Sequence, residues 1–132
     1  MMEVQSVYST SIKNDRSIIA CLLVSRGKYV TDEKFVIDTG AKYTCCRYTV
    51  VDKTLEEKKL RNFSDFRLIG GMVEGEYLKF YKYHLNQFTI GNVDMGEQDI
   101  WIIFDDRITD IILGMDIPKQ IIMVVNPYHQ KI

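Results

Sequence analysis

Apolar residues in this chain recur with a period of two, in short runs that are separated by glycine-bearing turns. Side chains of a β-strand point alternately to opposite faces, so this period is typical of strands that are buried on one face. In residues 77–84 the expected faces are Tyr77, Lys79, Tyr81 and Tyr83 on one side, and Leu78, Phe80, Lys82 and His84 on the other. The pattern predicts an all-β fold, a small barrel or a sandwich.

The expected elements can be placed along the chain from the apolar runs and their turns. Strands are predicted at residues 17–24, 34–37, 48–51, 66–69, 76–88, 88–90, 100–104, 110–113 and 121–125, with 66–69 and 76–88 forming a hairpin. One short C-terminal helix, at residues 115–120, is expected to begin at Asp116-Ile117-Pro118, because Asp caps helices and Pro fits a first turn. Residues 55–60 are either a short helical turn or a charged loop.

Length and composition indicate one ordinary globular domain, residues 1–132, with a core at about 17–125. The 46% of hydrophobic and 27% of charged residues exclude disordered and low-complexity classes. The formal net charge is -1, which gives no broad basic surface for nucleic acid. We therefore expect no nucleic-acid partner.

The cysteines and the absence of a long apolar run indicate the compartment. Cys21, Cys45 and Cys46 are odd in number, and two are adjacent, so neither a disulfide framework nor a zinc site fits. The N-terminal residues are polar and mixed, and the apolar run 17–25 is too short to span a bilayer. We expect a soluble cytoplasmic protein with no membrane partner.

The most informative segment is Asp38-Thr39-Gly40-Ala41, which directly follows the apolar run 35–37. A strand would carry the carboxylate of Asp38 into a tight turn, where Gly40 allows a close backbone approach and the Thr39 hydroxyl forms a local hydrogen bond. An ionisable group beside an apolar strand is costly unless it has a partner. Asp38 is thus either a functional carboxylate or an Asp that caps the turn.

Two further elements follow in order, the glycine-bearing hairpin around Gly70-Gly71 and then Ile112-Leu113-Gly114. This order resembles the retropepsin family of aspartic peptidases, over residues 17–125. The resemblance implies a small closed β-barrel with one short C-terminal helix. The chain has one Asp-Thr-Gly, so the resemblance also implies a homodimer in which each chain supplies one Asp38.

In that family the two carboxyls share one proton and activate a water molecule, so the implied function is an aspartic endopeptidase without cofactor or metal. The implied catalytic residues are Asp38, Thr39 and Gly40. The implied substrate-binding residues are Ala41, Lys42, Gly70, Gly71, Met72 and Val73, with the hairpin as a flap over an extended peptide.

Two features depart from the family pattern, and the segments that would form the dimer interface are only candidates. Lys42 stands where viral members usually carry an acidic residue, and Glu74 and Glu76 lie near the expected flap tip. In the family the termini pair into an interface sheet, for which residues 121–125 and 3–8 are the candidates.

Other chemistries have weaker support. A nucleophilic cysteine would need His84 or His129 close to Cys45 or Cys46, and no local signature predicts this. The alternating lysines and tyrosines of residues 79–83 have the composition of a single-strand nucleic-acid platform, but a solvated face is favoured. The alternative function is a catalytically silent module of the same fold that binds peptides or proteins, or that dimerises.

Overall fold

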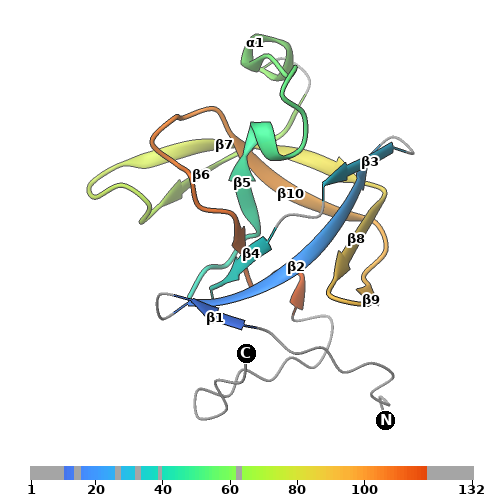
Figure 1. Cartoon of the computed structure of the whole chain (residues 1–132). Coiled ribbons are helices and arrows are strands. Elements are labelled where there is room, and N and C mark those ends of the chain that lie inside the picture. Colours follow the sequence, from blue (N-terminus) through green and yellow to red (C-terminus); the bar gives the residue numbers. More distant parts are fainter. Residues whose placement is uncertain are drawn as a thin grey trace.

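The computed structural model describes residues 11–13, 16–25, 28–31, 34–38, 40–61 and 64–118 (Figure 1). The strands are Ser11–Lys13 (β1), Arg16–Ser25 (β2), Lys28–Thr31 (β3), Lys34–Ile37 (β4), Cys45–Arg47 (β5), Phe66–Gly70 (β6), Tyr77–Leu85 (β7), Gln87–Ile90 (β8), Val93–Asp94 (β9), Gln98–Ile103 (β10) and Ile112–Leu113 (β11). A 3₁₀ turn at Tyr48–Val50 (η1) and a short helix at Glu57–Leu60 (α1) complete the described elements. The predicted all-β class is confirmed for these residues.

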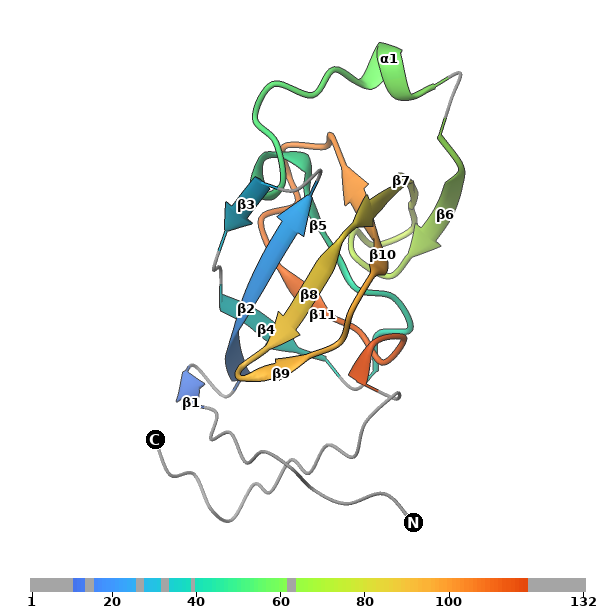
Figure 2. The same ribbon diagram turned by 90° about the vertical axis from the view of Figure 1, so that its right-hand side faces the viewer.

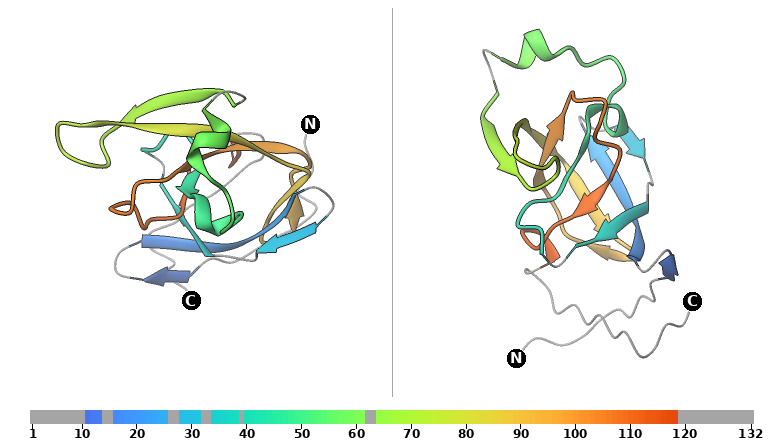
Figure 3. Two further views of the ribbon diagram at one scale, coloured as in Figure 1. Left: turned by 90° about the horizontal axis from the view of Figure 1, so that it is seen from above. Right: turned by 90° about the vertical axis from the view of Figure 1, so that its left-hand side faces the viewer.

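The strands form one sheet with the order β6-β7-β10-β5-β11-β4-β2-β8-β9, and β1 and β3 pair with β2. Seen from above, this sheet bends around the core, and the β6–β7 hairpin projects beyond it (Figure 3). The expectation of a closed barrel is wrong, because the path begins at β6 and ends at β9. Closure requires the two end strands to pair, but β6 belongs to the projecting hairpin and β9 has only two residues.

Buried apolar side chains form two clusters. The main core contains Leu23, Phe35, Phe88, Ile100 and Leu113, and an edge-to-face contact joins the rings of Phe35 and Phe88. The second cluster, which we call the hairpin core, consists of Cys45, Leu78, Phe80, Trp101, Ile103, Ile108 and Ile112. The hairpin is thus attached to the body through its own apolar cluster.

Strand β7 contributes to both cores in succession. Leu78 and Phe80 are buried in the hairpin core, while Tyr77 and Lys79 are exposed. Further along, Tyr81 and Leu85 are buried in the main core. The predicted alternation is confirmed, but each face of the strand is buried along only half of its length.

Several predicted boundaries differ from the structure. The strand expected at residues 48–51 is wrong, since β5 precedes it and residues 48–50 form η1. The return arm of the hairpin ends at Leu85 rather than Phe88, because the Asn86 N–H donates to the carbonyl of Val24. At residues 55–60 the helical alternative is confirmed by α1, which lies apart from the sheet at one end of the molecule (Figure 2).

The expected C-terminal helix is described only in part. Residues 115–117 form a turn and Pro118 is buried, whereas residues 119 and 120 lie outside the described residues. The strand predicted at 121–125 and the candidate interface segment at 3–8 also lie outside them.

Candidate active site

Asp38 lies directly after β4, where the strand pairs in parallel with β11. Its N–H donates to the carbonyl of Leu113 at 3.1 Å, which fixes the backbone at this point. The Oδ1 atom of Asp38 accepts a hydrogen bond of 3.0 Å from the Gly40 N–H, and a Cβ on Gly40 would lie 3.4 Å from this oxygen. The predicted tight turn after the strand is therefore present, and the backbone of Gly40 approaches the Asp38 carboxylate closely, as expected. Thr39 lies outside the described residues.

The loop that carries Asp38 crosses β11, because β11 is inserted between β4 and β5. The buried Thr44 anchors this loop: its hydroxyl donates to Oδ1 of Asp116 at 2.7 Å and accepts from the Gly114 N–H at 3.1 Å. A Cβ on Gly114 would overlap the backbone of Tyr43, whose nitrogen would be 2.7 Å away. A glycine at position 114 is therefore required for the two segments to pack. Sequence reasoning singled out Gly114 but not Thr44, and it assigned Asp116 to a helix start.

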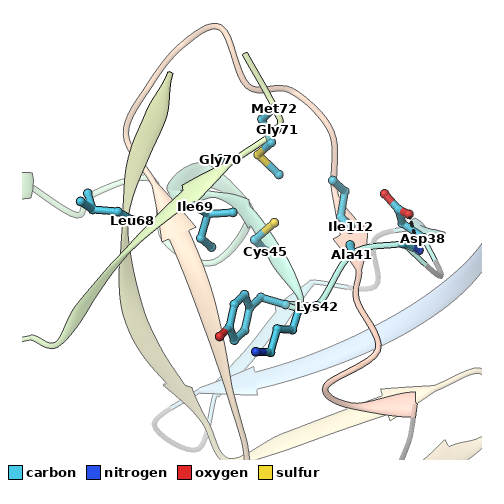
Figure 4. A pocket seen from close by; sticks show the side chains of 12 residues that line it. Asp38, Ala41, Lys42, Cys45, Leu68, Ile69, Gly70, Gly71, Met72 and Ile112 are labelled. Atoms are coloured by element: carbon cyan, nitrogen blue, oxygen red, sulfur yellow. Dashed lines mark hydrogen bonds between the residues drawn. The ribbon is translucent and has the colours of Figure 1, made fainter. Parts of the chain in front are cut away.

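A pocket of about 420 Å³ lies between this loop and the β6–β7 hairpin (Figure 4). Seven of the predicted site residues line it: Asp38, Gly40, Ala41, Lys42, Gly70, Gly71 and Met72. Five other lining residues were not predicted as site residues: Tyr43, Cys45, Leu68, Ile69 and Ile112. Of the two remaining predicted residues, Thr39 lies outside the described residues, and Val73 packs against the hairpin core and is outside this lining.

The turn of the hairpin depends on two glycines in the left-handed region. Gly71 has φ of 93° and Gly75 has φ of 76°, and both have open space where a Cβ would be. The Glu76 N–H donates to the carbonyl of Val73 and closes the turn. These contacts close the turn of the hairpin, whose Gly70, Gly71 and Met72 line the pocket together with Asp38.

The order of these parts agrees with the comparison with known families. A sequence model of the aspartyl protease family matches residues 26–117, which include Asp38, the hairpin and Gly114. The chain belongs to the aspartyl protease family. Its relation is to the retropepsin-like branch that the motif order predicted. A search of the curated proteins found none that matches this chain.

The structure does not favour a cysteine nucleophile. Burial raises the pKa of the Cys45 thiol to about 12, and the charges of Asp116, Asp38 and Asp110 add to this effect. His84 is exposed, and its ring nitrogens contact Asp99 at 2.8 Å and Glu97 at 3.3 Å rather than a cysteine. A thiol that stays protonated at neutral pH is a poor nucleophile. His129 lies outside the described residues.

The part of the chain that the structure describes contains no group of three His, Cys, Asp or Glu side chains placed to hold a metal ion. The same residues contain no helix with the length and apolar character needed to cross a membrane.

Proposed function

We propose that this member of the aspartyl protease family is an endopeptidase, active as a homodimer in which Asp38 of each chain contributes to one site. The observation that carries the proposal is the position of Asp38 at the border of the pocket under the β6–β7 hairpin. Only Oδ1 of its carboxylate is occupied by the Gly40 N–H, and Oδ2 has no protein donor among the described residues. The carboxylate is partly exposed, so a second carboxyl and a water molecule have access to it.

The chemistry follows from two carboxyls that share one proton. The ionised carboxylate removes a proton from a water molecule, whose oxygen forms a bond to the carbonyl carbon of the peptide. The protonated carboxyl donates its proton to the carbonyl oxygen, which gives a neutral diol. The ionised carboxylate then removes a proton from one hydroxyl of the diol, the C–N bond breaks, and the leaving nitrogen takes the proton of the other carboxyl, so the dyad again holds one proton.

The other predicted residues position the substrate in this proposal. An extended peptide lies between the 40–43 loop and the hairpin, with backbone hydrogen bonds for affinity and side-chain pockets for selectivity. Gly40 presents its backbone carbonyl, and Gly70, Gly71 and Met72 cover the peptide and exclude water. Ile69, Met72 and Ile112 supply the apolar walls of the pocket.

The test is cleavage of a mixed peptide library at high protein concentration across pH. Wild type and the control Asp94→Asn, at an exposed position on β9, are expected to cleave at acidic to near-neutral pH. Asp38→Asn is expected to fold and to show no cleavage, because an amide neither accepts nor donates the proton as a carboxyl does. Equal cleavage by Asp38→Asn and wild type would overturn the proposal. No cleavage by any variant would favour a peptide-binding module of the same fold.

A further inference from the structure

Two cationic side chains flank the ring of Tyr43, which lines the pocket. The Nζ atom of Lys42 lies 5.6 Å from the centre of this ring, and the guanidinium carbon of Arg67 lies 4.5 Å from it. Arg67 also donates from Nη1 to the Tyr43 hydroxyl at 2.6 Å and lies 5.0 Å from the ring of Trp101. Both cations therefore lie beside one aromatic residue of the pocket. Arg67 is held there by its hydrogen bond and is itself outside the pocket lining.

Neither cation is neutralised by a neighbour. Among the described residues, Lys42 and Arg67 form no ion pair with a carboxylate. Five other described cations do have such partners, namely Arg47, Lys58, Arg61, Lys82 and Arg107. Lys34, Lys53, Lys59 and Lys79 also have no ion pair among the described residues. What distinguishes Lys42 and Arg67 is their position beside Tyr43, which lines the pocket.

The surroundings of these cations favour an anion that comes from outside the chain. Cys45, Ile69 and Ile112 give the pocket apolar walls, and low-dielectric walls concentrate the field of nearby charges. A guanidinium carries several N–H donors in a planar fork, of which the Tyr43 hydroxyl occupies one. The remaining donors suit a carboxylate, and Lys42 is exposed and able to approach the same group.

The distance from Asp38 limits where such a group sits in a substrate. Figure 4 shows Asp38 at one end of the pocket, with Lys42 apart from it. A sphere of this volume is roughly 9 Å across, which is the span of about three residues of extended peptide. An acidic side chain that reaches Lys42 therefore lies within about three residues of a bond held at Asp38, a range that includes the position next to that bond's two residues.

We infer that the pocket selects peptides with an apolar side chain at the cleaved bond and an Asp or Glu beside it, bound by Lys42 and Arg67. The inference rests on the proposed peptidase function, because that function fixes the position of the cleaved bond. In a symmetric dimer the second chain supplies the same pair of cations. An acidic residue is therefore preferred on both sides of the bond.

The test separates binding from cleavage. Three peptides carry a central Leu-Phe pair and differ only in the two residues that flank it, which are both Glu, both Gln or both Lys. Binding is measured by fluorescence anisotropy with Asp38→Asn, which the proposed function makes inactive. We expect the Glu peptide to bind roughly three- to tenfold more tightly than the Gln peptide at low salt, with a smaller ratio at high salt.

Variants identify the residues responsible. Lys42→Gln and Arg67→Gln, each in the Asp38→Asn background, are expected to lower the Glu-to-Gln ratio towards one. Lys42→Glu is expected to shift the preference towards the Lys peptide. The control Lys53→Gln removes an exposed charge in the turn before α1 and is expected to leave the ratio unchanged. Thermal unfolding of each variant shows whether the fold is retained.

The outcomes distinguish the two proposals. A Glu preference in binding without cleavage by the wild type would support the charge selectivity and overturn the peptidase function. Cleavage by the wild type that is indifferent to the flanking charge would support the peptidase function and overturn the charge selectivity. The selectivity is also overturned if Lys42→Gln and Lys53→Gln have equal effects, or if none of the three peptides binds.

Discussion

At the residue scale, the position of Asp38 depends on how closely two backbone segments approach each other. Met115 donates to the carbonyl of Ala41 at 2.9 Å, and Thr44 donates to Asp116 from both its backbone N–H and its hydroxyl. Gly114 lies between these contacts with its Cα against the backbone of Tyr43. The loop that carries the carboxylate is therefore held by the segment that follows β11.

We predict that Gly114→Ala destabilises the fold by about 3 kcal/mol, since an added methyl group overlaps backbone rather than a side chain that can move. Gly71→Ala is the matched control, because its Cβ meets nothing within 4 Å. Its cost is the left-handed backbone conformation alone, about 1 kcal/mol. Urea unfolding of the two variants measures the difference. Equal losses of stability would contradict a steric role for Gly114.

The same residues show what the sequence can predict of the site. Asp38 and Gly40 are neighbours in the chain, and their hydrogen bond is local, so a short motif identified both. Gly70, Gly71 and Met72 could be placed because a hairpin positions its own turn. Tyr43 and Cys45 could not be placed at the pocket from the sequence, because their positions depend on the register of β5 against β10 and β11. Period-two patterns carry no information about that register.

At the element scale, an ion-pair network connects the hairpin to the turn after β10. Arg107 donates to both carboxylate oxygens of Glu76, at 2.8 and 3.2 Å, and to Oδ2 of Asp105 at 2.7 Å. The side-chain hydrogen bonds from Arg107, together with the one from its backbone N–H, lower the pKa of Asp105 to about 2, and the side-chain bonds also lower the pKa of Glu76. The base of the hairpin turn is thus connected to the 105–107 segment by one side chain.

We predict that Arg107→Gln raises the pKa of Asp105 towards the ordinary carboxyl value of about 3.9. A carboxyl whose pKa is lowered by folding stabilises the fold above its unfolded pKa, and this contribution is lost as pH falls towards the folded value. Wild type should therefore lose stability between about pH 4 and pH 2, and Arg107→Gln should lose less in that window. Carboxyl-carbon NMR titration gives the pKa, and unfolding at each pH gives the stability.

Lys82→Gln is the control for this network, because it breaks the ion pair with Asp65 and does not touch Arg107. Asp105 should titrate in this variant as in the wild type. The assignment is wrong if Lys82→Gln and Arg107→Gln move the titration of Asp105 equally.

The elements also show why some boundaries were missed. The sequence of β7 alternates throughout, and the alternation alone cannot show that the strand leaves one core and enters another. Residues 48–51 are apolar enough for a strand, but Val51 N–H and Asp52 N–H both donate to the Tyr48 carbonyl and close a turn there. Tyr48 then stacks on Phe104 at 4.5 Å, a tertiary contact that no local pattern reveals.

At the scale of the whole molecule, the described fold presents one Asp38 at one pocket, whereas the proposed chemistry needs two carboxyls. The order of Asp38, the hairpin and Gly114 along the chain was enough to predict the family, and the match to the aspartyl protease family confirms that prediction. The prediction of a closed barrel was wrong, because the period of two does not show whether the two end strands of a sheet pair with each other. The second carboxyl must come from a second chain in the proposed site, which gives activity a dependence on assembly.

We predict that cleavage per chain rises with protein concentration and falls to background where the protein is monomeric by analytical ultracentrifugation. Mixing supplies a sharper test. When wild type exchanges subunits with a roughly ninefold excess of Asp38→Asn, about a tenth of its chains keep a wild-type partner, so activity per wild-type chain should fall to about a tenth. The same excess of Asp94→Asn, which retains Asp38, should cause no such loss. A site contained in one chain would be indifferent to either added protein, and that result would exclude the shared pair of Asp38 carboxyls.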